Sequence, residues 1–384
     1  MRGAGLLLAV HDFPPAVGGE ATLYHALARH LPPRETLVLA PRAPGAETID
    51  AALPAEVVRR WLPAHGGTLS RIARGVLSGA HLLALLARRP PRYILCGQLL
   101  SLGVPTRLVA AGFGIPYAVF VHGADLVDYH DRIPWASLIR WVLRGSDAVI
   151  VNSRFTGSLV ERLAPGEAQR IVVLPIGVDP APAVDPAEAA RLRQRYGLAD
   201  GPVLLSVSRL VAMKGHDMVL EALPGLVLRF PSLRYLVVGD GPYRVDLERR
   251  AGDLGVAPSV IFAGRVPATE LPAHYALASL FVQLSRETGQ YDGLEGFGIS
   301  LLEAASHGVP SIAGRSGGIP EAVAEGESGL LVPPRDPLAF AAAAARLLAD
   351  SPERGRMAQA ARRWAAAHPW ERAAGCLRSL LPEA

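Results

Sequence analysis

Four residues in the second half of the chain have types and spacings suited to a phosphorylated, hydroxylated ligand. Arg209 and Lys214 follow an apolar run, and Lys214 is the single lysine of a chain that otherwise uses 38 arginines. Arg can bind a diphosphate as a planar fork and Lys as a point charge, so the pair can neutralise it. Glu295 and Glu303 can accept hydrogen bonds from sugar or ribose hydroxyls, which would offset the cost of burying a carboxylate. The alternative is two solvated cations, a helix-capping Glu303 and a solvated Glu295.

Glycines flank these candidate residues. The segment Gly293–Gly308 reads GLEGFGISLLEAASHG and opens a predicted helix, and its Gly296 and Gly298 would let backbone amides come close to a ligand. The unpaired amides and the positive dipole end of the helix start favour an anionic oxygen. The pair Gly18–Gly19, in the loop after the first apolar run, suits the same close approach.

Three weaker patterns could serve other chemistry. His122 follows the apolar run Tyr117–Val121, where it either touches a ligand or is structural. Three aspartates spaced by three, from Asp125 to Asp131, raise the alternative of a metal site, but no Asp-x-Asp pair accompanies them and we expect no catalytic metal. The segment Gly239–Arg244 lacks the third glycine of a dinucleotide fingerprint, so we expect no nicotinamide cofactor.

Buried strands must position these side chains. Apolar runs that do not alternate with polar residues are typical of parallel sheets covered on both faces. In the first half the runs are Leu6–Val10, Thr36–Ala40, Tyr93–Cys96, Tyr117–Val121, Ala148–Val151 and Ile171–Leu174. In the second half they are Val203–Val207, Tyr235–Gly239, Val260–Ala263, Leu280–Leu284, Pro310–Ala313 and Gly329–Val332. Strand and helix in repeated alternation predict an α/β fold with two doubly wound parallel-sheet (Rossmann-like) domains facing across a cleft.

The division into domains follows from the chain length and from one linker. A length of 384 residues suits two domains, and the segment Pro175–Pro186 is rich in proline and aspartate. We expect a first domain over residues 1–180, a second over 181–367, and a last helix over 368–384 that crosses back to the first domain.

Composition excludes several classes of protein. Half of the residues are hydrophobic and 19% are charged, which is typical of a globular protein rather than a disordered one. Two distant cysteines exclude a disulfide scaffold and a thiolate zinc site. The apolar stretch Ile94–Val121 contains prolines and an arginine, so we expect no membrane span there and a cytoplasmic protein.

The charge is uneven along the chain. Residues 1–180 carry 18 arginines against 13 acidic residues, which indicates an anionic partner such as a lipid surface, or else a coding bias toward arginine. The stretch Thr68–Arg92 is both basic and apolar. It predicts either contact with an anionic membrane or an ordinary amphipathic core helix.

In this order along the chain, the motifs resemble the retaining glycosyltransferases of family 4, which have the GT-B fold. The resemblance covers most of the chain and is densest over residues 202–334. It rests on Glu295 and Glu303 as a Glu-x7-Glu pattern, Arg209 and Lys214 as an Arg-x4-Lys pair, Gly18 and Gly19, His122, the segment Ser316–Val323 and the segment His368–Arg372. The region Ser285–Val323 is particularly similar to bacterial mannosyltransferases that act on phosphatidylinositol lipids.

The resemblance implies a role for each matched residue. The first domain would bind the acceptor and the second a nucleotide-sugar, a GDP- or UDP-sugar, with no further cofactor. Arg209 and Lys214 would hold the diphosphate, Glu303 the ribose and Glu295 the sugar hydroxyls, while His122 would act at the reacting centre. Donor contacts are also implied for Gly18, Gly19, Gly296, Phe297, Gly298 and Ile299, and near the base for Arg265 and Val266.

The implied reaction is a retaining, metal-independent hexosyl transfer to a lipid-linked or saccharide hydroxyl, with no nucleic-acid partner. No well-placed carboxylate nucleophile is evident in the first domain, which favours attack from the same face of the sugar. The alternatives are a nucleotide-sugar epimerase of the same architecture and a non-catalytic nucleotide-sugar binding protein. A phosphorylase would need a second lysine to anchor pyridoxal phosphate.

Overall fold

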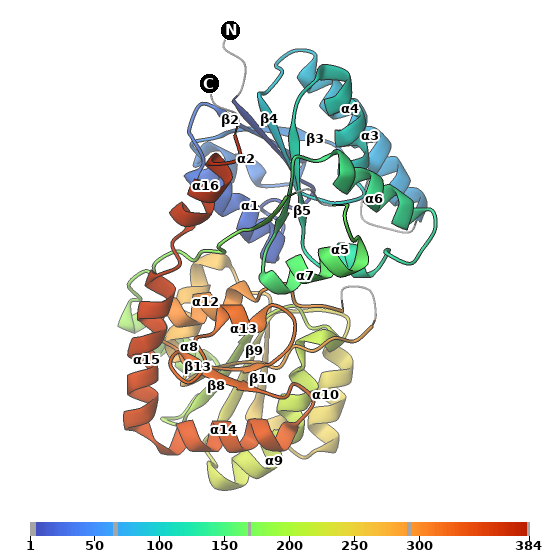
Figure 1. Ribbon diagram of the computed structural model, residues 1–384. Coiled ribbons are helices and arrows are strands. Elements are labelled where there is room, and N and C mark those ends of the chain that lie inside the picture. The colour runs from blue at the N-terminus through green and yellow to red at the C-terminus, as the bar shows by residue number, and fades with distance from the viewer. Residues whose placement is uncertain (1–4, 64–67, 168–169, 290–292, 382–384) are drawn as a thin grey trace. The chain divides into compact units, whose positions relative to one another are not determined.

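The protein divides into two compact units. The computed structural model describes residues 5–63, 68–167, 170–289 and 293–381 (Figure 1). Unit 1 comprises Met1–Ile176 together with Trp370–Ala384, and unit 2 comprises Gly177–Pro369. The sequence placed the corresponding changes at residues 180 and 368. The first change of unit lies inside the proline-rich segment Pro175–Pro186. The second lies between the last two helices, α15 (Ser351–Ala366) and α16 (Trp370–Arg378).

Unit 1 is built on a parallel sheet of seven strands in the order β3-β2-β1-β4-β5-β6-β7. Its strands are β1 (Leu6–Ala9), β2 (Thr36–Pro41), β3 (Glu56–Arg60), β4 (Tyr93–Cys96), β5 (Tyr117–Val121), β6 (Ala148–Val151) and β7 (Ile171–Val173). Its helices are α1 (Gly19–His30), α2 (Ala46–Ala51), α3 (Thr68–Leu86), α4 (Gly103–Phe113), α5 (Ala124–Val127), α6 (Trp135–Gly145), α7 (Arg154–Leu163) and α16 (Trp370–Arg378). The last helix, α16, packs against α1.

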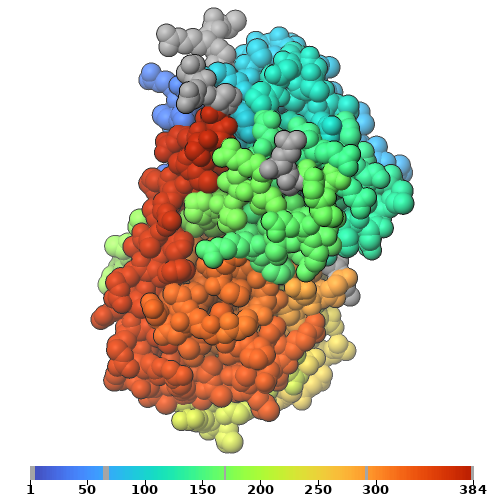
Figure 2. Space-filling model, in the orientation of Figure 1, coloured from blue at the N-terminus to red at the C-terminus, as the bar shows by residue number. Residues whose placement is uncertain are grey.

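Unit 2 contains a second parallel sheet, of six strands in the order β10-β9-β8-β11-β12-β13. Its strands are β8 (Val203–Val207), β9 (Arg234–Val238), β10 (Val260–Gly264), β11 (Leu280–Gln283), β12 (Ser311–Gly314) and β13 (Gly329–Val332). Its helices are α8 (Pro186–Arg195), α9 (His216–Arg229), α10 (Arg244–Asp253), α11 (Leu271–Leu277), α12 (Ile299–Ser306), α13 (Ile319–Ala322), α14 (Pro337–Ala349) and α15 (Ser351–Ala366). Helix α15 packs along α12 on the outside of the unit (Figure 2).

Two doubly wound α/β units are thus confirmed, with one strand more than the sequence predicted. All six predicted runs in each half lie in strands, because every central strand is buried on both faces. The strand that was missed is β3, whose sequence is EVVRR. It lies at the edge of the sheet, where its side chains are partly exposed and do not have to be apolar.

Candidate active site

The candidate site of unit 2 lies where its strand order reverses, between β8 and β11. From β8 the chain passes outward to β9 and β10 at one edge of the sheet, and from β11 it passes outward to β12 and β13 at the opposite edge. In open parallel sheets this is where the loops at the carboxyl ends separate and a ligand can bind. The loop after β8 carries Arg209 and Lys214, and the segment after β11 leads to Glu295 and the start of α12. The sheet therefore brings together residues that are 81 positions apart along the chain.

Gly215 allows the Lys214 loop to lie directly against the end of β11. It has φ of +73°, and a β-carbon there would lie 2.0 Å from the carbonyl oxygen of Leu284. The same loop is also bonded to the segment after β11, because the amide of Arg286 donates to the carbonyl oxygen of Met213 over 2.8 Å. Arg286 also makes a buried two-point ion pair with Asp217, at 2.8 and 2.7 Å. Gly215 and the Arg286–Asp217 ion pair therefore fix the position of the loop that carries Lys214.

The Glu295 carboxylate is the meeting point of this site. Its Oε2 atom accepts from Lys214 Nζ, from Gln283 Nε2 at 2.8 Å and from Ser285 Oγ at 3.2 Å. The Lys214 and Glu295 side chains are only 13% and 14% exposed, so the ion pair is largely shielded from water. Two of the four residues that the sequence singled out in this half are therefore in direct contact. Gln283 and Ser285 were missed, although a glutamine inside an otherwise apolar strand was a readable signal.

The backbone from Glu295 to Gly298 is held by a second glycine pair. The amide of Gly318 donates to the carbonyl oxygen of Glu295 over 3.0 Å. A β-carbon at Gly317 would lie 2.2 Å from that oxygen, and one at Gly318 would lie 1.9 Å from the carbonyl oxygen of Gly296. Gly298 then adopts φ of +99° and begins α12. The first turn of α12 is linked to Glu295 through Gln283, which contacts both Glu295 Oε2 and Ser300 Oγ. The first amides of a helix have few partners within the helix, so this end of α12 favours an anionic ligand.

Glu303 lies on the second turn of α12 and accepts a 2.7 Å hydrogen bond from the hydroxyl of Tyr275. Burial raises the pKa of Glu303, and the nearby charge of Asp179 raises it further. The hydrogen bond from Tyr275 lowers it. Tyr275 also stacks on His307, with ring centroids 5.0 Å apart. Glu303 is therefore a constrained carboxylate with one oxygen already bonded, rather than the cap of a loop.

A chain of buried hydroxyl and imidazole groups lies beneath the Lys214 loop. His216 Nε2 contacts Ser208 Oγ at 2.9 Å, and His216 Nδ1 contacts the hydroxyl of Tyr235 at 2.8 Å. The Tyr235 hydroxyl lies 2.9 Å from Ser206 Oγ. Burial, and secondarily the charge of Lys214, lower the pKa of His216 to about 4, so the imidazole is neutral at physiological pH. The network connects β8 and β9 to the loop that presents Lys214.

The remaining predicted residues of unit 2 lie at the same edge of the sheet. Arg209 follows β8 and is exposed, and Arg265 follows β10 and is also exposed. Val266 beside it is partly buried. The segment Gly239–Arg244 follows β9, the strand between β8 and β10. A β-carbon at Gly241 would be 2.4 Å from the carbonyl oxygen of Leu210. Gly239 and Gly241 therefore allow the loop after β9 to pack closely on the loop after β8.

Unit 1 presents its own cluster at the ends of β1, β4 and β5. His122 Nε2 lies 2.6 Å from the hydroxyl of Tyr24, which in turn donates to the carbonyl oxygen of Gly97. The Tyr24 hydroxyl must therefore accept from His122, which places a proton on Nε2. Glu20 Oε2 lies 3.8 Å from the same nitrogen. Gly18, with φ of +155°, begins α1 and brings Glu20 to this position.

Two carboxylates, those of Glu20 and Asp125, lie near His122. Asp125 Oδ1 accepts from the amides of His122 and Gly123, at 3.1 and 3.0 Å. Burial raises the pKa of Asp125 to about 6, and the nearby His122 acts in the opposite direction. Glu20 comes from α1, so its proximity to His122 depends on the fold and is invisible in the order of residues. Asp125 is thus bonded to backbone amides.

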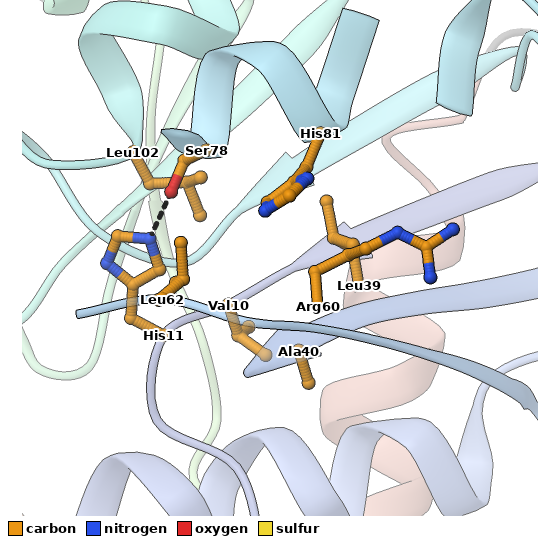
Figure 3. Close-up of a pocket in the computed structure, with 9 residues that line it drawn as sticks. All are labelled: Val10, His11, Leu39, Ala40, Arg60, Leu62, Ser78, His81 and Leu102. Atoms are coloured by element: carbon orange, nitrogen blue, oxygen red, sulfur yellow. Dashed lines mark hydrogen bonds between the residues drawn. The ribbon is translucent and has the colours of Figure 1, made fainter. Parts of the chain in front are cut away.

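A small pocket opens at the carboxyl ends of β1, β2 and β3 in unit 1 (Figure 3). Its lining residues are Val10, His11, Leu39, Ala40, Arg60, Leu62, Ser78, His81 and Leu102. His11 is held there by Ser78 Oγ at 2.8 Å and by Ser101 Oγ at 3.1 Å. No sequence motif marked His11, because its partners come from α3 and from the loop before α4.

The three aspartates Asp125, Asp128 and Asp131 lie in α5 and in the segment that follows it. In the part of the chain that is described, no three His, Cys, Asp or Glu side chains come close enough together to hold a metal ion. Asp125 is engaged by two backbone amides, and His130 Nδ1 contacts the carbonyl oxygen of Val127 at 2.9 Å.

Comparison with known proteins shows which family has this arrangement. The profile described as Glycosyl transferases group 1 matches residues 189–364, and the one described as Glycosyl transferase 4-like domain matches residues 18–177. A GDP-mannose-dependent alpha-(1-6)-phosphatidylinositol monomannoside mannosyltransferase of Mycolicibacterium smegmatis is 39% identical, over 94% of this chain and 93% of its own. The chain belongs to the family 4 glycosyltransferases. This glycosyltransferase is also 35% identical to a protein of the same description from Mycobacterium tuberculosis H37Rv, over 98% and 97% of the two chains.

Solved structures agree on the fold of this glycosyltransferase. HepE of Anabaena, in complex with UDP and glucose, superimposes with a TM-score of 0.81 at 21% identity, over 98% of this chain and 99% of that one. At that identity the likeness establishes the GT-B architecture only. The sequence relatives confirm the predicted family and class of enzyme, and the solved structure confirms the predicted fold class. The roles of the individual site residues remain predictions.

Proposed function

We propose that this glycosyltransferase transfers mannose, with retention of configuration and without a metal ion, from GDP-mannose to a phosphatidylinositol-type lipid at a membrane surface. One observation carries the choice of substrates: relatives described as GDP-mannose-dependent phosphatidylinositol monomannoside mannosyltransferases share 35–39% of their residues with it over nearly the whole chain. The geometry of unit 2 supports the donor half of the proposal, because its cations, carboxylates and helix amides match the parts of a nucleotide-sugar.

The donor would be bound part by part along the carboxyl edge of the unit 2 sheet. Lys214 and Arg209 take the diphosphate, together with the first amides of α12, because all three present positive charge at this edge. Glu303 takes ribose hydroxyls through the carboxylate oxygen that Tyr275 does not use. Glu295 takes sugar hydroxyls, since three donors already fix its orientation. Arg265 is exposed and follows β10, and we expect it to lie near the base of the nucleotide.

The chemical step follows from this charge arrangement. Breaking the bond between the anomeric carbon and the diphosphate oxygen builds positive charge on the sugar and negative charge on the diphosphate. Fixed cations and helix amides stabilise the departing diphosphate without reorganising, which is the largest usual source of catalysis in such sites. The acceptor hydroxyl attacks from the same face, and the leaving phosphate oxygen takes its proton. We expect His122 to contact the transferred sugar through the ring nitrogen that Tyr24 does not engage.

The acceptor proposal rests on one face of α3. Leu69, Ile72, Val76 and Leu83 are 84%, 50%, 67% and 52% exposed, and their spacing of three, four and seven places them on one stripe. The opposite face is buried and carries Arg74, Ser78, Leu82 and Leu86. Among the helices that the structure describes, this is the one long and apolar enough to cross a membrane by length and composition. Because its other face packs inside unit 1, we propose that it lies on the lipid surface.

A vesicle experiment tests this face of α3 separately from catalysis. Wild type should sediment with vesicles that contain about 30% phosphatidylinositol, and the double variant Ile72→Ser, Val76→Ser should bind them about tenfold more weakly, since two side chains lose roughly 1–2 kcal/mol of burial in lipid. Leu338→Ser, at a residue of unit 2 that is 80% exposed, is the matched control. Equal binding of all three proteins would refute the membrane face.

A product assay tests the reaction. The purified protein should convert GDP-mannose and a phosphatidylinositol monomannoside to GDP and a dimannosylated lipid, with an α-linkage visible by proton NMR. A β-linked product would overturn retention. Free GDP with an altered sugar and no need for an acceptor would identify an epimerase, and tight binding with no product would identify a binding protein.

A further inference from the structure

Gln283 is a polar residue at the end of the buried strand β11. It is 3% exposed, and Phe281, Val282 and Leu284 around it are fully buried. A buried carboxamide costs free energy unless its donors and acceptor are bonded, so its hydrogen bonds should be specific. No motif of the family pattern includes it.

The hydrogen bonds of Gln283 connect three parts of the donor site. Its Oε1 accepts from Ser300 Oγ, in the first turn of α12, at 2.9 Å. Its Nε2 donates to Glu295 Oε2 at 2.8 Å and to Ser285 Oγ at 3.1 Å. An ionised carboxylate only accepts, so the amide nitrogen has to face Glu295 and the carbonyl oxygen has to face Ser300. The carboxamide therefore has a single orientation.

The same carboxylate oxygen of Glu295 is shared with Lys214. When a diphosphate is present, the Lys214 ammonium must divide its three donors between Glu295 and phosphate oxygens. Gln283 does not carry charge and does not face that competition. It can keep Glu295 in place while Lys214 turns to the diphosphate.

We propose that Gln283 is a positioning residue that orients the Glu295 carboxylate toward the sugar of the donor, and so determines the part of the donor affinity that comes from the sugar. This inference rests on the proposed nucleotide-sugar function. It assigns Gln283 no contact with the nucleotide, so binding of the sugar and of the nucleotide should separate in its variants.

The test compares two ligands on three proteins. Kd is measured by calorimetry for GDP and for GDP-2-deoxy-2-fluoromannose, which is slow to react. In Gln283→Met, which keeps the length but has no donor, Kd for the fluorosugar should rise about tenfold while Kd for GDP stays within about twofold, since one hydrogen bond to a charged group is lost. Gln194→Met, at an exposed residue of α8, should change neither constant.

A second variant gives a readout that a merely structural role would not move. Gln283→Glu places a carboxyl beside Glu295, where two neighbouring carboxylates share one proton. In this variant kcat/KM should fall toward high pH, and the fall should begin at a lower pH than any such fall in wild type. An unchanged profile would overturn the proposal.

The outcomes distinguish this inference from the proposed function. If Gln283→Met binds both ligands as wild type does, or loses both equally with a lower melting temperature, the positioning role is overturned. If wild type binds UDP and a UDP-sugar but not the GDP pair, the proposed donor is wrong, and the same comparison is made with the UDP pair. Should Gln283→Met fail to fold, Ser300→Ala removes the other anchor of the carboxamide and should weaken only fluorosugar binding.

Discussion

Replacing Lys214 by methionine removes the one ammonium group of the chain and keeps the length of the side chain. In the free enzyme the loss is moderate, because Glu295 still accepts from Gln283 at 2.8 Å and from Ser285 at 3.2 Å. The carboxylate is thus not left without partners. We expect the free energy of unfolding to fall by only about 1–2 kcal/mol, and the protein to remain folded at 25 °C.

The effect on the reaction should be much larger. A charge-assisted hydrogen bond to the ground-state diphosphate is worth about 1.5–3 kcal/mol, so Kd for GDP should rise roughly tenfold to a hundredfold. Negative charge grows on the diphosphate as the sugar departs. Loss of one fixed donor at such a position costs about 10²–10³ in kcat. The two effects together place kcat/KM for the donor at least about 10³-fold below wild type.

The assay is donor turnover with radiolabelled GDP-mannose, combined with calorimetric GDP binding. Arg249→Met is the matched control, because Arg249 lies on α10, 72% of its side chain is exposed, and its partner is Asp246. The control should retain wild-type kinetics. A Lys214→Met enzyme with kcat/KM within about fivefold of wild type, a difference of about 1 kcal/mol, would refute the assignment of Lys214 to the diphosphate.

Three further perturbations have defined outcomes. A chelator should leave the rate unchanged, and a loss that Mg²⁺ or Mn²⁺ restores would refute metal independence. Gly318→Ala would place its β-carbon 1.9 Å from the carbonyl oxygen of Gly296, so it should displace the loop that carries Glu295 and lower kcat/KM about tenfold. Gly225→Ala, in open space on α9, should be neutral, and equal activities of the two variants would contradict the loop argument. The low pKa of His216, about 4 against 6.5 unfolded, means that the unfolded chain binds the extra proton. The stability is therefore complete above pH 6.5 and is lost as pH falls, by about 2 kcal/mol between pH 7 and pH 5. Urea unfolding should show that His216→Gln loses less than wild type, and an equal loss would refute a neutral buried His216.

The sequence was most informative where chemistry and local structure coincide. Parallel strands covered on both faces are mostly apolar, so twelve of the thirteen strands could be read as runs. Strand β3 was missed because an edge strand tolerates Glu56 and the two arginines at its end. Lys214 and Glu295 were found separately, by residue type and by glycine spacing. Their contact with one another could not be read, since it depends on the register of β8 and β11.

Residues that orient others were the ones missed. Tyr24, Gln283 and Ser285 have no motif of their own, because their role is defined only by what they touch in the folded chain. Glu20 was missed for the same reason, as its distance of 3.8 Å from His122 depends on the packing of α1 beside β5. The proximity of the Glu20 carboxylate to His122 is therefore a property of the fold that residue order did not reveal.

A crystal structure of the protein with GDP and the slow fluorosugar donor tests the central claim most directly. We predict that phosphate oxygens lie within hydrogen-bonding distance of Lys214 Nζ, of the Arg209 guanidinium and of the first amides of α12, with Glu295 on the sugar hydroxyls. A diphosphate bound elsewhere, with the Lys214–Glu295 ion pair unchanged, would contradict the account.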